Sequence, residues 1–304
     1  MGFRLERLST EPVLRPVQEH DWERAAVFNA AATLWRGRIV LLYRASDQPF
    51  GLDYSHSYVS AIGFAESRDG IHFERRPEPV MRGVGPQEAR GVEDPRLSRI
   101  GNRFHMVYTA FGGREPTDFR IAMATSRDLI HWGERRLLLD EPNKDGALLP
   151  ARIGGRYFLF HRRPPSIWLA ESTDMVHWEN HREILLPRAG YWDSARIGIG
   201  PAPLRVDGGW LLIYHGVDAR NTYRLGAALL DAREPWRVLD RLEEPILEPE
   251  TDWERNGWIP NVVFACGAVD TGDRLLVFYG AADTYVGAAQ VAKSEIRFES
   301  RRAA

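Results

Sequence analysis

The sequence predicts an all-β protein in which residues 1–304 form a single-domain five-bladed β-propeller. The first observation is a hairpin motif, a glycine-containing turn followed by a short apolar strand, that occurs five times. The second is its spacing, because the aromatic residues that end these strands lie 65, 53, 53 and 65 residues apart, which leaves room for four short strands per repeat. The third is that no long helical periodicity interrupts the series. A closed ring of similar sheets follows.

Each copy of the motif has the same order of features. The copies lie at residues 37–44, 101–109, 155–162, 208–215 and 272–280, and their final rings are Tyr43, Tyr108, His161, Tyr214 and Tyr279. Glycine permits the tight turn and the apolar run suits a buried strand, so each copy is expected to be the central hairpin of one blade. In the first three copies a Ser/Asp turn and a histidine follow. We expect these histidines, His72, His131 and His177, to be packed residues of edge strands rather than metal ligands.

The start of the chain resembles the segment before its last hairpin. Residues 11–16 and 21–24 match residues 244–249 and 252–255 in type and order. This similarity completes a fifth repeat and predicts that the N-terminal segment helps to close the ring. Ring closure removes exposed strand edges, which otherwise promote aggregation.

The composition limits the partners and the location of the protein. The net charge is −2 and the pI is about 6.5, so the totals do not indicate a nucleic-acid partner. No apolar run approaches the roughly 18 residues of a membrane helix, and no signal-peptide pattern is visible at the N-terminus. The single cysteine, Cys266, excludes an internal disulfide. We therefore expect a cytoplasmic protein without a membrane partner.

Residues that differ between the repeats are the candidates for chemistry. Directly after the apolar strands lie Arg44, Thr109, Arg162, His215 and Gly280, and near the start of the innermost strands lie Asn29, Asp94, Ala147, Gly200 and, from the N-terminal similarity, Asn261. Antiparallel pairing brings the two sets to one mouth of the ring. Asp94 is then the one carboxylate of the inner layer, with Glu93 directed away from it. A carboxylic acid in a sugar-sized cleft, with a raised pKa, suits a general acid.

Hydrolysis of a glycoside usually requires a second carboxylate, as a nucleophile or as a base for water. The corresponding inner position holds Asn29, and an amide cannot act as a base. Inorganic phosphate arrives already ionised and needs a cationic site instead, which Arg162, Arg196 and His215 can form. No metal-ligand spacing or nucleotide loop is present, so we expect no cofactor beyond phosphate as co-substrate.

Several short stretches resemble glycoside hydrolase family 130, the β-mannoside phosphorylases and their hydrolytic relatives. They are residues 28–31, 41–45, 91–96, 194–198, 209–217, 260–264 and 279–284. The resemblance implies inverting phosphorolysis, in which phosphate attacks the anomeric carbon of a β-mannoside and releases α-mannose 1-phosphate. It places Asp94 as the acid, donating through the mannosyl 3-hydroxyl. It places Asn29, Arg44, Asn261 and Asp283 at the sugar, and Arg162, Arg196 and His215 at the phosphate.

One departure and several alternatives remain. Phosphorylases of this type often have lysine where this chain has Arg196, which replaces a point charge by a planar fork. Lys144 and Arg152 are weaker phosphate candidates, because Lys144 precedes its strand and Arg152 lies near a hairpin turn. A β-mannoside hydrolase and a non-catalytic carbohydrate-binding propeller are the alternative functions. The linkage, β-1,4 or β-1,2, stays open, as does the acceptor, whose subsite depends on loops and, in a homo-oligomer, on a neighbouring subunit.

Overall fold

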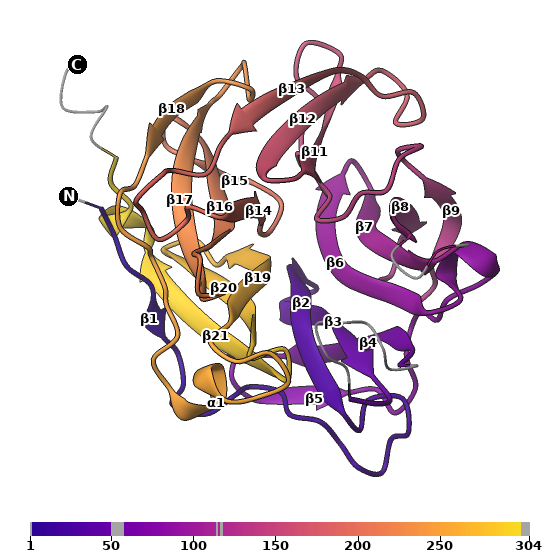
Figure 1. The fold of residues 1–304 in the computed structure, drawn as a ribbon. Helices are drawn as coiled ribbons and strands as arrows, with labels where there is room; N and C mark the ends of the chain where they lie inside the picture. Colours follow the sequence, from indigo (N-terminus) through magenta and orange to yellow (C-terminus); the bar gives the residue numbers. More distant parts are fainter. Residues whose placement is uncertain (1, 50–57, 114, 116–117, 299–304) are drawn as a thin grey trace.

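A computed structural model describes residues 2–49, 58–113, 115 and 118–298 (Figure 1). It confirms the all-β prediction, since helix is confined to α1 (Asp252–Arg255) and to the two 3₁₀ turns η1 (Pro86–Glu88) and η2 (Lys293–Glu295) among these residues. No helix in the described segments is long and apolar enough to cross a bilayer. The position of the site is therefore set by strands and their connections.

Strand pairing groups the described strands into four sheets, one of which has eight strands because the single Ser60–Gly91 pair joins two four-stranded groups; we describe the strands as five units around a common centre (Figure 1). The first unit contains β2 (Ala26–Trp35), β3 (Arg38–Ser46), β4 (Ser60–Ser67) and β5 (Phe73–Arg75). The second contains β6 (Gly91–Ile100), β7 (Arg103–Gly112), β8 (Asp118–Ser126) and β9 (Gly133–Leu137). The third contains β10 (Ala147–Leu148), β11 (Tyr157–Arg163), β12 (Ser166–Ser172) and β13 (Glu179–Leu185).

The last two units complete the ring. In the fourth, β14 (Arg196–Ile199) and β15 (Leu204–Val206) share the innermost position beside β16 (Gly209–Val217), β17 (Tyr223–Asp231) and β18 (Val238–Arg241). The fifth contains β19 (Val263–Asp270), β20 (Arg274–Ala281), β21 (Tyr285–Ala292) and β1 (Glu6–Arg7). Because β1 pairs antiparallel with β21, the N-terminal strand joins the last unit.

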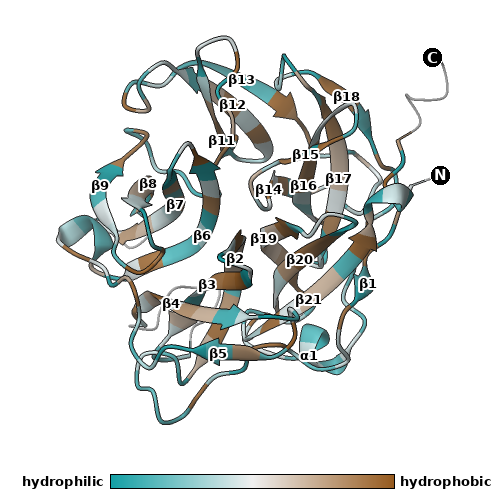
Figure 2. Cartoon of the chain, turned by 180° about the vertical axis from the view of Figure 1, so that it is seen from behind, coloured by the Kyte–Doolittle hydropathy of each residue, from teal (hydrophilic) through white to brown (hydrophobic). Residues whose placement is uncertain are grey.

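The predicted hairpins correspond to the innermost and second strands of each unit, since the glycine turns lie between β2 and β3, β6 and β7, β10 and β11, β15 and β16, and β19 and β20. Their apolar runs lie in β3, β7, β11, β16 and β20, and the terminal rings at 43, 108, 161, 214 and 279 are all buried. Apolar residues concentrate in the strands near the centre, such as β2 and β19, whereas the loops at the rim are mostly hydrophilic (Figure 2). The core is therefore spread over the interfaces between neighbouring units.

The histidines after the Ser/Asp turns do not pack as predicted. His72, His131 and His177 are strongly exposed, and the Nδ1 atom of each lies 2.7–2.8 Å from the aspartate of its turn. The same aspartates accept hydrogen bonds from the backbone N–H groups two and three residues later, which is the pattern of an Asx turn. These histidines therefore stabilise turns at the rim of the molecule.

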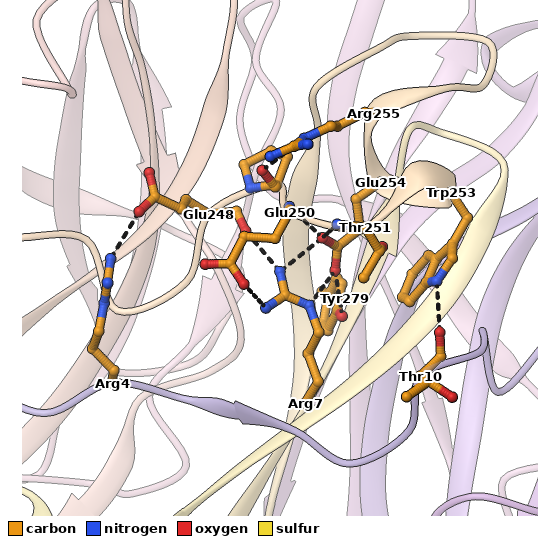
Figure 3. A network of polar contacts seen from close by, with 11 residues as sticks. Arg4, Arg7, Thr10, Glu248, Glu250, Thr251, Trp253, Glu254, Arg255 and Tyr279 are labelled. Carbon is orange, nitrogen blue, oxygen red and sulfur yellow. Dashed lines mark hydrogen bonds and ion pairs between the residues drawn. The ribbon is translucent and has the colours of Figure 1, made fainter.

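Ion pairs hold the N-terminal segment to the last unit (Figure 3). Arg7 in β1 forms an ion pair with Glu254 in α1 at 2.7 Å and another with Glu250 at the same distance. Trp253 donates its indole N–H to the carbonyl oxygen of Thr10. Glu254 is buried, so its charge needs the partner that the N-terminal strand supplies.

Candidate active site

A narrow pocket opens between the inner strands and is lined mostly by polar residues. Its lining consists of Asn29, Arg44, Tyr58, Glu93, Asp94, Lys144, Asp145, Arg162, Tyr223, Ile259, Val262, Phe264 and Asp283. These side chains come from all five units. The ring therefore gathers at one point residues that are up to about 250 positions apart in the chain.

Two β-bulges place the inner polar residues. Pairing between β2 and β3 skips from Phe28 to Ala31, and pairing between β6 and β7 skips from Glu93 to Arg96. The residues inside these bulges, Asn29 and Asp94, have φ near +50°, which Asn and Asp tolerate better than most residues. The bulge turns each polar side chain out of the sheet alternation and toward the pocket.

The register corrects the predicted equivalence of the inner positions. Ala147 pairs with Phe160 at the level where Ala31 pairs with Leu42, so Ala147 corresponds to Ala31 and not to Asn29. The residue of the third unit that corresponds to Asn29 and Asp94 is Asp145, whose φ is +60°. Counting back from the apolar strand missed it because Ala147 and its partner Phe160 are 13 positions apart, whereas Ala31 and Leu42 are 11 apart, so the hairpin of the third unit is two residues longer.

The fifth unit departs from the prediction for a different reason, because Asn261 was taken from the N-terminal similarity, whereas the pairs Gly267–Phe278 and Ala31–Leu42 both span 11 positions and the two hairpins are equally long. Ala265 pairs with Tyr279, which makes it the counterpart of Asn29. Asn261 lies before β19, is exposed, and is not among the pocket-lining residues. Gly200 similarly faces Ile213, one pair inward from the pocket, through a hydrogen bond between its N–H and the Ile213 carbonyl oxygen.

Asp94 lies in a network with Asn29 and Arg44. The Asn29 amide Nδ2 donates to Asp94 Oδ1 at 2.8 Å, and Arg44 Nη1 lies 3.2 Å from the same oxygen. Asn29 Oδ1 is buried and accepts no hydrogen bond within the described part of the chain. Burial opposes ionisation of Asp94, but the charges of Arg44 and Arg96 outweigh it and lower the pKa of this carboxyl. The expected raised pKa is therefore wrong for the protein by itself.

Glu93 also faces the pocket, contrary to the prediction from an extended strand. Arg44 Nη2 lies 2.7 Å from Glu93 Oε1 and so bridges the two carboxylates. The bulge at Asp94 explains the difference, since it removes the strict alternation of sides along β6. Burial raises the pKa of Glu93, although the guanidinium of Arg44 works in the opposite direction.

Asp283 is a third acidic residue of this wall, on the turn between β20 and β21. Burial raises the pKa of its carboxyl to about 7, and the negative charge of Asp94 adds to the effect. Its neighbour in space is the β2 bulge, because Gly280 lies directly against Asn29. Near neutral pH this carboxyl is divided between its two protonation states.

The third unit supplies cations to the pocket lining, Lys144 and Arg162, which we call the cation wall. Arg162 follows the apolar run of β11, and its Nη1 lies 2.7 Å from Asp145 Oδ2. Lys144 also lines the pocket and is half-buried, although it precedes its strand. Arg152 is exposed and donates from Nε to the Gly155 carbonyl oxygen at the hairpin turn, outside the pocket lining. Lys144 therefore reaches the site from the segment that precedes β10.

Two predicted phosphate residues lie behind the lining. His215 is fully buried, with its ring centroid 4.3 Å from that of Phe264 and its Nε2 3.7 Å from Asp145 Oδ2. Burial, together with the charge of Arg162, lowers the pKa of His215 to about 3, so it is neutral at physiological pH and adds no positive charge. Arg196 is half-buried and donates from Nη2 to the hydroxyl of Tyr223 at 2.7 Å.

Asp145 and Tyr223 are pocket residues that the sequence did not reveal. Arg162, His215 and Arg96 surround Asp145, and despite burial they lower its pKa well below the usual range. Tyr223 is the first residue of β17 and lines the pocket, and its hydroxyl accepts the hydrogen bond from Arg196. The available signal for Asp145 was its residue type, since the other two polar inner positions hold Asn29 and Asp94.

An all-β scaffold whose narrow pocket combines the carboxyl groups of Asp94 and Asp283 with the cations of Lys144 and Arg162 fits a carbohydrate-active enzyme. The family model of the β-1,4-mannooligosaccharide phosphorylases, glycoside hydrolase family 130, matches residues 4–297. The chain therefore belongs to this family, which confirms the predicted resemblance and the assignment as an enzyme.

Relatives support the same conclusion. A β-1,2-mannobiose phosphorylase of Thermoanaerobacter sp. (strain X514) is 54% identical, over 97% of this chain and 100% of that protein. A 1,2-β-oligomannan phosphorylase of the same strain is 49% identical, again over 97% and 100%. The solved structure of the β-1,2-mannobiose phosphorylase from Listeria innocua, in complex with β-1,2-mannobiose, superposes with a TM-score of 0.86 at 29% identity, over 96% of this chain and 98% of that chain.

Proposed function

We propose that this enzyme cleaves β-1,2-linked mannobiose or short β-1,2-mannans with inorganic phosphate, with inversion, to give α-mannose 1-phosphate. The observation that carries the proposal is the pairing of two walls in one pocket. Asp94, held by Asn29, faces the side of the third unit that presents Lys144 and Arg162. The β-1,2 linkage rests on the relatives with 54% and 49% identity, since the β-1,4 relative among them is 31% identical.

The proposed roles follow from charge and hydrogen-bonding capacity. Asp94 is the acid. Asn29, Arg44 and Asp283 hold the hydroxyls of the mannosyl unit, and the unpaired Asn29 Oδ1 accepts a hydrogen bond from one of these hydroxyls. Lys144 and Arg162 bind the phosphate oxygens directly. Tyr223, with Arg196 behind it, completes that wall through a hydroxyl.

His215 and Asp145 support the phosphate wall. Neutral His215 lies behind the lining, with its Nε2 3.7 Å from Asp145 Oδ2, and adds no charge. Asp145 fixes Arg162 through the contact at 2.7 Å. We also infer that residues 1–304 act as one catalytic unit in the cytoplasm, and that they need only a small carbohydrate and phosphate, with no other cofactor.

Hydrolysis is the second candidate, because the pocket contains further carboxylates that the sequence did not reveal. Glu93 and Asp145 are both ion-paired with arginine, at 2.7 Å in each case, and are therefore poor bases for water. Their engagement favours phosphate as the nucleophile. A hydrolase that inverts configuration needs a carboxylate free to deprotonate water.

The test runs the reaction in the direction of synthesis. The purified protein is incubated with α-mannose 1-phosphate and a panel of acceptors that includes mannose, glucose, N-acetylglucosamine and β-1,2-mannobiose, and released phosphate is measured. Release with mannose or β-1,2-mannobiose supports the proposal and identifies the leaving group. Water-dependent liberation of mannose from β-mannosides, with no phosphate release for any acceptor, would establish the hydrolase.

A further inference from the structure

Four of the five units contain the same buried polar contact at the end of the apolar strand. The ring-end tyrosine donates its hydroxyl to a carboxylate at 2.6–2.9 Å, and an arginine of the outermost strand pairs with that carboxylate at 2.6–2.9 Å. The sets are Tyr43–Glu23–Arg75, Tyr108–Glu88–Arg135, Tyr214–Asp193–Arg241 and Tyr279–Glu254–Arg7. The last of them is drawn in Figure 3. This contact ties the outermost strand of each unit to the segment that precedes its innermost strand.

The third unit replaces all three members by other groups. His161 takes the place of tyrosine and is fully buried. Its Nδ1 lies 3.1 Å from Asn143 Nδ2, and its Nε2 lies 3.0 Å from Nδ1 of His181 in the outermost strand β13. A carboxylate, a phenol and a guanidinium are thus exchanged for an amide and two imidazoles. The replacement occurs in the unit that supplies Lys144, Asp145 and Arg162 to the pocket.

The hydrogen bonds fix the orientation of all three side chains, Asn143, His161 and His181. Asn143 Oδ1 accepts the backbone N–H of Arg162 at 3.2 Å, so Nδ2 is the amide end that points at His161. An amide nitrogen can only donate, which makes His161 Nδ1 an acceptor and places the His161 proton on Nε2. Nε2 then donates to His181 Nδ1, which leaves the proton of His181 on its own Nε2. Both rings are neutral in this arrangement.

Asn143 also fills a gap in the sheet. In the third unit, β10 pairs with β11 only through Ala147 and Leu148, whereas the inner strand of the first unit pairs with β3 as far as Ser46. The Arg162 N–H therefore lies beyond the last inner pair, and the Asn143 side chain supplies its acceptor. Asn143 directly precedes Lys144 and Asp145, so one side chain connects both segments that carry the cations of the pocket.

We propose that Asn143, supported by His161 and His181, is a positioning residue that holds Lys144 and Arg162 at the separation needed to bind phosphate. This role rests on the proposed function of that wall. A protonated imidazole would disrupt it, because His161 would then present N–H groups on both sides and oppose the Asn143 amide. Turning the amide over would withdraw Oδ1 from the Arg162 N–H.

The surroundings keep the two rings neutral. Burial, together with His181 and the charge of Arg163, lowers the pKa of His161 to about 3, while Glu141 acts in the opposite direction. Burial and Arg163 also lower the pKa of His181, which Glu141 again opposes. Glu141 is itself paired with Arg163 at 2.9 Å, so the net charge beside the rings is small. The unit therefore keeps its geometry across the neutral pH range.

The experiment compares Asn143→Ala and His181→Ala with the wild-type enzyme. We expect the KM for phosphate to rise about tenfold in Asn143→Ala and about threefold in His181→Ala, while the KM for the mannoside changes less than about twofold. His181 is partly exposed, so His181→Ala is the variant that folds most readily. Tyr108→Phe is the matched control, since it removes the corresponding hydrogen bond in the second unit, and it should leave the KM for phosphate unchanged.

Nitrogen NMR of the imidazoles tests the hydrogen bonds among Asn143, His161 and His181 without an activity measurement. The Nε2–H tautomer for both His161 and His181 supports the arrangement, and an Nδ1–H tautomer of His161 overturns it. Folded Asn143→Ala and His181→Ala enzymes with wild-type KM values for phosphate would also overturn the positioning role. If the wild-type protein neither uses phosphate in turnover nor binds inorganic phosphate in calorimetry, the proposed function fails together with this role. Phosphorolysis with unchanged variants refutes the positioning role alone.

Discussion

Replacing Gly280 by alanine should displace Asn29 and so impair the carboxyl groups of the pocket. A Cβ added at this position would lie 2.1 Å from Asn29 Oδ1 and 2.9 Å from the Asn29 backbone nitrogen. Ordinary contact begins near 3.4 Å, so the amide must move by about 1.3 Å. That displacement exceeds what the hydrogen bond of 2.8 Å between Asn29 Nδ2 and Asp94 Oδ1 can absorb.

We expect Gly280→Ala to reduce kcat/KM for phosphorolysis about 100-fold, the scale of a 1 Å misplacement in an active site. Overpacking should lower the free energy of unfolding by about 1–3 kcal/mol. The assay follows α-mannose 1-phosphate formed from β-1,2-mannobiose, with urea unfolding measured in parallel. Gly133→Ala is the control, because no heavy atom lies within 4 Å of its added Cβ and its backbone is not in the left-handed region. A folded Gly280→Ala enzyme with kcat/KM within twofold of the wild type would refute the role assigned to Asn29.

Three further changes test individual roles. Asp94→Asn should lower kcat about 1000-fold while calorimetry still detects β-1,2-mannobiose binding, and near-normal turnover would show that another group is the acid. Lys144→Gln should raise the KM for phosphate about tenfold whereas Arg152→Gln, outside the pocket, should not; equal KM values in the two variants would remove Lys144 from the phosphate wall. The pKa of Asp283 is raised to about 7 in the folded protein, so stability should fall as the pH rises from about 4 to about 7. Asp283→Asn should flatten that part of the urea-unfolding curve against pH, and an unaltered slope contradicts the raised pKa.

The repeat made the scaffold and the carboxyl wall predictable. Tyr43, Tyr108 and their equivalents end apolar strands at regular spacing, so a ring of hairpins follows from the sequence alone. Asn29 stands out because it interrupts a mostly apolar inner strand, and Asp94 because it occupies the equivalent position of the second repeat. Arg44 could be placed beside them because the end of one antiparallel strand meets the start of its partner.

The cation wall was harder to predict for two physical reasons. The hairpin between β10 and β11 is two residues longer than that between β2 and β3, so Asp145 and Lys144 fall two or three residues away from the position that strand counting gives. A short sequence motif also does not reveal whether a side chain is buried. His215 therefore looked cationic in the sequence, whereas desolvation makes it neutral in the fold.

The lowered pKa of Asp94 is compatible with its role as acid once the charge of phosphate is considered. The ammonium of Lys144 contributes to lowering the pKa of Asp94, as it does for Asp145 and Asp283. A phosphate dianion bound to Lys144 and Arg162 offsets this field and adds negative charge, so both effects raise the pKa of Asp94 toward the range of a useful proton donor.

Phosphate would then prepare the acid as well as attack the sugar, and water could not replace it in the first role. The alkaline limb of the pH profile reports the pKa of the acid, so it should move to higher pH as phosphate approaches saturation. Profiles of kcat/KM for the mannoside at low and saturating phosphate check this. Superimposable alkaline limbs would mean that the charge of phosphate does not reach Asp94, and that the acid is activated by the sugar alone.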